Sequence, residues 1–214
     1  MKMIDIEIRD VCIEDVATIK EAINEVWDFA SILGSKAVLD ATLSFYFNQV
    51  MYRSTYGRVA IMNGEVLGVI FGYIKGEAPQ YRHLLQDISE ITMTLMMATD
   101  EERNGLYEYF SKQTAVYGEL IDGLESDYDG SLEFIVLSRV AQGKGVGRLL
   151  WENLKTHFEG CGITKIYVYT DTDCNYGFYD HLGFSCRRSK EVVYDFEGVE
   201  YTPKNFMYEM TLKK

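Results

Sequence analysis

The sequence predicts a mixed α/β fold, in which helices flank a central sheet. Strand-like runs alternate with helical runs along the chain, and this order is typical of such folds. Two β-rich runs, residues 58–62 and 65–75, are separated by Asn63-Gly64, which suits a type I′ hairpin turn because both central positions need positive φ. A third observation is a strand-like run that leads through a glycine-rich turn into an amphipathic helix, within residues 131–159.

The spacing of apolar residues predicts the elements in order. A period of two indicates a half-buried strand, and recurrence every three or four residues indicates a helix. Strands are expected at residues 4–9, 58–62, 65–75, 131–138, 165–170, 192–194 and 205–212. Helices are expected at residues 13–27, 39–50, 84–96, 106–121, 146–159 and 175–181, with a capped start at Thr99. Only two prolines are present, so we expect no Pro-rich linker and one domain over residues 1–214.

The composition restricts the partners of the protein. A net charge of −12 disfavours nucleic acid, because neutralising phosphates needs a basic surface. No apolar run approaches the roughly 18 residues of a membrane span. The start of the chain alternates apolar and charged residues as a strand does, unlike a signal peptide. We therefore expect a cytoplasmic location, with neither nucleic acid nor a membrane as partner.

The cysteines and histidines do not predict a metal site. The cysteines are widely spaced and form no CxxC pair, so reduced core thiols are the expectation for Cys12, Cys161, Cys174 and Cys186. The three histidines have no metal-ligand spacing with one another or with the cysteines. No bound metal is expected.

The turn between the strand-like run 131–138 and the following helix has the features of a diphosphate site. Glycines at alternate positions 143, 145 and 147 let backbone N–H groups approach an anion without interference from Cβ atoms. The start of the helix adds unpaired N–H donors and a partial positive charge. Lys144 and Arg148 add two mobile cations.

Two common nucleotide-binding patterns do not fit this turn. A Walker A loop requires GxxxxGK[ST], which is absent. A dinucleotide-binding fingerprint would require glycine where the chain has Arg148, and it also expects an early βαβ unit. A nucleotide-binding protein that uses the same turn is therefore a third-ranked hypothesis.

Two motifs resemble those of the GNAT superfamily of acetyltransferases. The pattern Q/R-x-x-G-x-G/A fits Gln142-x-x-Gly145-x-Gly147, and in that family such a loop binds the pyrophosphate of acetyl-CoA. Residues 171–184 resemble the family's later segment, which ends in Tyr-x-x-x-Gly-Phe and here begins that ending at Tyr179. The resemblance is specific over residues 131–185 and looser over residues 4–75.

The resemblance implies a mostly antiparallel sheet of about six to seven strands. The family's third and fourth strands are usually joined by a short connection, and this chain departs from that pattern, because a helical insertion at about 76–130 lies between them. The resemblance also implies acetyl-CoA as cosubstrate. Backbone groups would pair with the pantetheine arm at Val136, Leu137 and Ser138. The pyrophosphate would lie on Gln142, Gly143, Lys144, Gly145, Val146, Gly147 and Arg148. Where the family often has Asn, seven residues before the tyrosine, this chain has Thr172, with Asn175 nearby; either would contact the cofactor.

The resemblance also implies direct attack of a neutral amine on the thioester in a ternary complex. Tyr179 stands where the family often has the acid that protonates the departing thiolate, and a phenol with a pKa of about 10 suits this task. Glu133 is a candidate general base, with its side chain on the face of the odd-numbered residues. A solvated carboxylate at the end of a strand is the alternative, and the amine could instead lose its proton through ordered water.

The predicted function is therefore that of an acyltransferase, an acetyl-CoA-dependent N-acetyltransferase acting on a primary amine. The acceptor is expected to be a small molecule or peptide amine, and small or cationic acceptors fit the acidic chain best. The insertion holds twelve acidic and three basic residues, a net charge of −9. It would wall the amine site, form a homodimer contact or merely decorate the fold. An acyl-CoA-binding protein that senses or scaffolds without catalysis is the alternative function.

Overall fold

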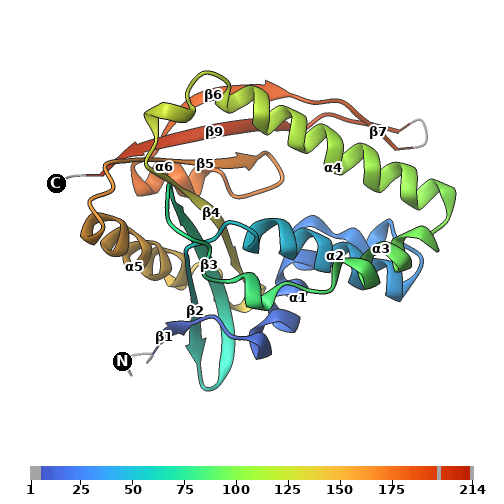
Figure 1. Cartoon of the computed structure of the whole chain (residues 1–214), viewed down its shortest axis with the longest axis horizontal. Coiled ribbons are helices and arrows are strands. Elements are labelled where there is room, and N and C mark those ends of the chain that lie inside the picture. Colours follow the sequence, from blue (N-terminus) through green and yellow to red (C-terminus); the bar gives the residue numbers. More distant parts are fainter. Residues whose placement is uncertain (1–5, 197–198, 213–214) are drawn as a thin grey trace.

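A computed structural model describes residues 6–196 and 199–212. Its main sheet has seven strands in the order β1-β2-β3-β4-β5-β9-β6. All neighbouring pairs are antiparallel except β4 and β5. Figure 1 shows β5, β9 and β6 running across the direction of β1–β3, so the sheet is strongly twisted. The predicted mixed α/β class and mostly antiparallel sheet are confirmed.

The bounds of the elements follow. The strands are β1 (Glu7–Asp10), β2 (Tyr56–Met62), β3 (Glu65–Ile74), β4 (Gly130–Leu137), β5 (Lys165–Asp171), β6 (Ser185–Glu191), β7 (Tyr194–Phe196), β8 (Val199–Tyr201) and β9 (Lys204–Thr211). The helices are α1 (Val16–Trp27), α2 (Lys36–Met51), α3 (Ile88–Met96), α4 (Asp100–Ile121), α5 (Val146–Gly160) and α6 (Gly177–Leu182). Strands β7 and β8 form a separate hairpin. Residues 4 and 5 of the first predicted strand lie outside the described residues.

Strands β4 and β5 part after a short parallel contact. Their register holds only two pairs, Gly130 with Ile166 and Ser131 with Tyr167. Strand β3, in contrast, follows β4 along its whole length to Leu137. Over the described residues 132–137, the edge of β4 that faces β5 therefore has no strand partner.

A β-bulge in β4 changes which residues share a face. Leu132 pairs with Gly72 and Phe134 with Phe71, so Glu133 is the extra residue. Before the bulge the odd-numbered side chains face α1 and α2, and after it the even-numbered ones do, as the packing of Phe134 and Val136 in that core shows. The face expected for Glu133, that of the odd-numbered residues, therefore ends at the bulge.

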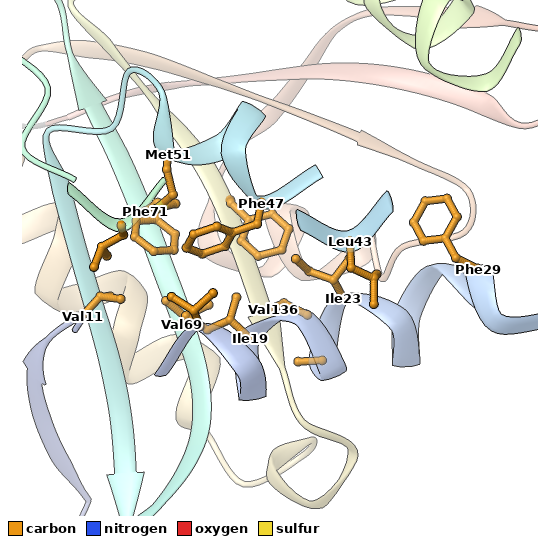
Figure 2. Packing of buried hydrophobic residues seen from close by; sticks show 14 of the residues in the cluster. Val11, Ile19, Ile23, Phe29, Leu43, Phe47, Met51, Val69, Phe71 and Val136 are labelled. Carbon is orange, nitrogen blue, oxygen red and sulfur yellow. The ribbon is translucent and has the colours of Figure 1, made fainter. Parts of the chain in front are cut away.

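Two main hydrophobic cores cover the opposite faces of the sheet. On one face, α1 and α2 pack against β2, β3 and β4, with Ile19, Ile23, Phe47, Met51 and Phe71 fully or almost fully buried (Figure 2). On the other face, α5 and α6 pack against the sheet through Trp151, Leu154, Phe158, Tyr179 and Phe184. Both faces of β3 and β4 are thus buried, which fixes the positions of the strands that border the opening.

The predicted insertion between the third and fourth strands is confirmed, and it consists of α3 and α4. Thr99 caps α4 as expected, since its side chain accepts from the Glu102 N–H while the Glu102 side chain accepts from the Thr99 N–H. Helix α4 lies along β9 and β6 (Figure 1) and buries Val116 and Leu120 against Met207 of β9. The insertion therefore covers the part of the sheet that is formed by β5, β9 and β6.

Several finer expectations have clear outcomes. Asn63 and Gly64 both have positive φ, 53° and 83°, so the hairpin turn is confirmed. The strand β6 was not predicted, because its side chains are mostly exposed and carry no apolar alternation. Cys161 and Cys186 are exposed, so the expectation of four core thiols was wrong for these two. In the described part of the chain, no helix is long and apolar enough to cross a membrane.

The start of the domain is held by an ion pair. Arg9 Nη1 and Nη2 each donate to one carboxylate oxygen of Asp15 at 2.7 Å, and the Cys12 N–H donates to Asp15 Oδ2 at 2.9 Å. Burial of Asp15 opposes its ionisation, but these hydrogen bonds outweigh it and hold its pKa below the usual range. The pair connects β1 to the turn that precedes α1.

Replacement of this carboxylate is expected to remove a pH-dependent part of the stability. A depressed pKa in the folded state gives stability above the unfolded pKa of about 3.9, and this stability is lost as pH falls through the folded pKa. Asp15→Asn should lower the free energy of unfolding by about 1–3 kcal/mol at pH 7. In urea denaturation the difference should shrink below pH ~4. Asp40→Asn is the control and should have little effect, because the Asp40 side chain, which pairs with Lys20, is 66 % exposed. Equal losses at pH 7 and pH 3 for Asp15→Asn would contradict the account.

Candidate active site

The opening between β4 and β5 presents free backbone groups. The Ser138 N–H donates to the Leu67 carbonyl at 2.9 Å, which sets the phase of the ladder with β3. Since hydrogen-bonding direction alternates along an antiparallel pair, the N–H and C=O groups of Ile135 and Leu137 point toward β5 instead. A ligand that lies in the opening would meet these groups. Of the three predicted backbone contacts, Leu137 faces the opening, whereas the backbone groups of Val136 point toward β3 and the Ser138 N–H is already bonded.

The glycine-rich turn lies at the open end of this gap. Gly143 and Gly145 have positive φ, 71° and 80°, and a Cβ atom at either would meet open space. Gly145 is the N-cap of α5, and its carbonyl accepts from the Leu149 N–H at 3.0 Å. The N–H groups of the first turn of α5 therefore have no intrahelical acceptor and are available to an anion.

Gly147 serves a different purpose in the same turn. A Cβ atom at this position would lie 3.2 Å from Leu137 and 3.3 Å from Phe178, closer than most packed side chains. The absence of a side chain lets the start of α5 pack directly on the end of β4 and on α6. This packing fixes the positions of the glycine-rich turn, the opening between β4 and β5, and helix α6, which carries Tyr179.

The two predicted phosphate cations are free to move. Arg148 has 78 % of its side chain exposed and lies 4.0 Å from Glu152, a distance at which the ion pair is weak. Lys144, Gln142 and Gly143 are exposed as well, whereas Val146 is buried beneath the turn. The cations are thus placed beside the free N–H groups without a strong competing anion among the described residues.

A cavity of about 240 Å³ lies where β4 and β5 part. It is lined by residues 132–135 of β4 and 167–171 of β5. Trp27 of α1 and Tyr46 of α2 close one side, and Gln113 and Tyr117 of α4 close another. The inserted helix α4 therefore contributes directly to the wall of the cavity.

Tyr179 lines this cavity from α6 and is 8 % exposed. Burial, followed by the nearby Cys174 and Asp171, raises the pKa of its phenol well above the usual value. The hydroxyl is thus protonated at neutral pH, as a proton donor must be, and its raised pKa makes it a weak acid. Its location is consistent with the predicted role, which stays a prediction.

Glu133 also lines the cavity, but it is held by Arg53. Arg53 Nε donates to Glu133 Oε2 at 2.6 Å, and Arg53 Nη2 donates to Glu133 Oε1 at 2.7 Å. The same guanidinium donates to the Tyr167 hydroxyl at 3.0 Å. Because both carboxylate oxygens are engaged, Glu133 could accept a proton only by breaking a bidentate ion pair. The role of Glu133 as a general base stays a prediction, and the ion pair with Arg53 opposes that role.

Asp171 is a candidate functional residue that the sequence did not single out for catalysis. It ends β5, lines the cavity and is 5 % exposed. One of its oxygens accepts from the N–H groups of Asp173 and Cys174, at 3.0 and 3.1 Å. Burial raises its pKa, so it is a better proton acceptor near neutral pH than an exposed carboxylate. Its burial depends on tertiary packing, and only its place at the start of the second motif could have drawn attention to it.

Thr172 and Asn175 lie away from the cavity walls. The Thr172 N–H donates to the Lys204 carbonyl at 3.1 Å, and the Thr172 hydroxyl accepts from the Lys204 N–H at 3.2 Å. Asn175 is exposed, and its carbonyl accepts from the Phe178 N–H at the start of α6. These bonds fix the loop before α6, and contact of either side chain with a cofactor stays a prediction.

The sequence model of the acetyltransferase (GNAT) family matches residues 21–184. The chain belongs to the GNAT family. It is therefore an acyltransferase, and its chemistry is acetyl transfer. The matched range includes the glycine-rich turn, both strands of the opening and Tyr179.

Solved structures share the fold of this GNAT protein. An N-acetyltransferase from Staphylococcus aureus Mu50 has a TM-score of 0.54 at 18 % identity, over 98 % of this chain and 99 % of that chain. A putative acetyltransferase from Salmonella typhimurium, solved with its cofactor acetyl-CoA, has a TM-score of 0.53 at 18 % identity, over 98 % and 95 %. A ribosomal-protein-alanine N-acetyltransferase from Brucella melitensis has a TM-score of 0.53 at 12 % identity, over 96 % and 99 %. No curated protein matches the chain.

Within the described residues, no group of three or more His, Cys, Asp or Glu residues is arranged to hold a metal ion.

The close packing at Gly147 generates a test of the turn. Gly147→Val should push the start of α5 away from Leu137 and Phe178, and so raise the Kd for CoA at least tenfold in isothermal titration calorimetry. Gly118→Ala is the matched control, because a Cβ atom there would meet nothing within 4 Å on the exposed face of α4. An unchanged Kd in Gly147→Val would refute the proposed position of the pyrophosphate.

Proposed function

We propose that this GNAT protein transfers the acetyl group of acetyl-CoA to a primary amine, by direct attack in a ternary complex. The observation that carries the proposal is the continuity of one opening between β4 and β5. The glycine-rich turn lies at its open end, and Tyr179 and the cavity lie toward its closed end. The donor would occupy the turn and the opening, and the acceptor would occupy the cavity.

The residues present fit acetyl-CoA. The open space over Gly143 and Gly145, together with the free N–H groups of α5, suits a pyrophosphate. Exposed Lys144 and Arg148 add positive charge beside it. Backbone groups of Ile135 and Leu137 suit the amides of a pantetheine arm, which is an extended chain that pairs as a strand does. Acetyl-CoA supplies a thioester, whose acyl carbon is open to attack by a neutral amine.

The protein's own groups would handle two protons. The bound ammonium must lose a proton before it attacks. Of the two carboxylates that line the cavity, Glu133 is paired with Arg53, so Asp171 is the candidate acceptor of this proton. As the new C–N bond forms and the C–S bond breaks, the sulfur leaves as a thiolate. Tyr179 would donate a proton to that sulfur, and the proton that the new amide nitrogen then loses would restore the phenol. Exclusion of water by Trp27, Tyr46 and Tyr117 would limit hydrolysis of the thioester.

The proposed acceptor is small and cationic. The cavity is small, and α1, α2 and α4 close it on several sides. Its charged lining residues are Arg53, Glu133 and Asp171, so it carries a net negative charge when both acids are ionised. This balance favours an ammonium group over an anionic acceptor.

Tyr179→Phe tests the proposal. With the best amine of a broad panel, and with release of free CoA as the measurement, kcat should fall at least tenfold while the Kd for CoA changes less than twofold. Tyr176→Phe is the matched control and should keep full activity, because Tyr176 lies three residues earlier and is 40 % exposed. Binding of acetyl-CoA with no turnover of any amine would favour the sensing or scaffolding function instead.

A further inference from the structure

We propose that the acceptor is a compact monoamine, in which a flat apolar body of about one ring carries a single ammonium group that pairs with Asp171. The inference rests on the proposed function and names its substrate class. It is drawn from the charges, the aromatic walls and the size of the cavity between β4 and β5.

Among the charged side chains that line the cavity, one carboxylate has no cationic partner, so the lining can pair with one cation. Arg53 and Glu133 neutralise each other through a bidentate ion pair. Asp171 has no cationic partner among the described residues; its side chain accepts from the N–H groups of Asp173 and Cys174 and is hydrogen-bonded to the Cys174 thiol. A buried carboxylate without a countercharge is costly, and an ammonium ligand would supply that charge.

The acidic insertion does not add a second cation site to the cavity. Helix α4 contributes Gln113 and Tyr117 to the lining, and neither carries a charge at neutral pH. Its carboxylates lie elsewhere: Glu119 pairs with Lys190, and Glu108 pairs with Lys112. A polyamine or an aminoglycoside would therefore place its additional ammonium groups against neutral side chains.

Two groups of aromatic side chains line the cavity. On the α1–α2 side, the Trp27 ring stacks on Phe134 with centroids 5.9 Å apart and lies 5.0 Å from the ring of Tyr46. On the α4 side, Tyr117 and Tyr169 stack at 4.3 Å and 4°. The Tyr169 hydroxyl donates to the Tyr117 carbonyl at 3.0 Å, which holds α4 against β5. Such walls suit a flat apolar body, and their ring faces attract the adjoining cation.

The size and the polar groups of the cavity agree with this class. Its volume of about 240 Å³ is below the roughly 300–1,000 Å³ of pockets that hold drug-sized ligands. Trp27 Nε1 belongs to a lining residue and is buried without a hydrogen-bond partner among the described residues. An unpaired polar atom of this kind is uncommon in a finished core, and a polar group of a ligand in the cavity would satisfy it.

A comparison of amines tests the substrate class. Free CoA release would be measured with 2-phenylethylamine, spermidine, kanamycin and a tripeptide with a free N-terminus. We expect kcat/KM for 2-phenylethylamine to exceed each of the others at least tenfold. A higher value for spermidine, kanamycin or the tripeptide would overturn the inference and leave the acetyltransferase function intact. Binding of acetyl-CoA with no turnover of any amine would overturn the proposed function itself.

Asp171→Asn tests the ammonium contact. The asparagine keeps an oxygen for the N–H groups of Asp173 and Cys174, so the loop should keep its fold. The KM for 2-phenylethylamine should rise at least tenfold, while the KM for acetyl-CoA should change less than twofold. Asp173→Asn, two residues on and outside the cavity lining, is the control and should leave both KM values nearly unchanged. A lower kcat with an unchanged amine KM would overturn the contact, because Asp171 would then act on the proton without binding the cation.

Discussion

The parting of β4 and β5 is the constraint on which the rest of the structure depends. Two register pairs join these strands, and beyond Ser131 the edge of β4 has no strand partner in the described chain. Buried backbone groups without partners are costly, so an opening of this kind persists only where both strands are held from elsewhere. Here β3 holds β4, β9 holds β5, and the helical layers cover both faces.

The same parting brings together groups from distant parts of the sequence. The bulge at Glu133 turns the side chains of Glu133 and Phe134 to the same face of the sheet. Glu133 therefore binds Arg53 there, and Phe134 packs on Trp27. Helix α4 then closes the side that an uninterrupted connection from β3 to β4 would leave open. The insertion thus contributes two neutral side chains, Gln113 and Tyr117, to the lining, while its carboxylates Glu108 and Glu119 are held in ion pairs outside the cavity.

Local signals predicted much of the fold and the glycine-rich turn of the candidate site. The turn at Asn63-Gly64, the cap at Thr99 and the glycines before α5 each depend on a few adjacent residues, and sequence spacing identifies them directly. Strand β6 escaped prediction because an exposed edge strand needs no apolar alternation. The Arg53–Glu133 pair joins residues 80 positions apart, and the burial of Asp171 arises from tertiary packing. Sequence periodicity carries neither kind of information, so the lining of the cavity had to come from the structure.

Amide hydrogen exchange, followed residue by residue with and without acetyl-CoA, tests the central claim most directly. If the opening and the turn hold the donor, the amides of Ile135 and Leu137 and those of the first turn of α5 should exchange at least tenfold more slowly with ligand. The Ser138 amide, already bonded to Leu67, should change far less. Protection confined to other parts of the sheet, with these amides unchanged, would contradict the account.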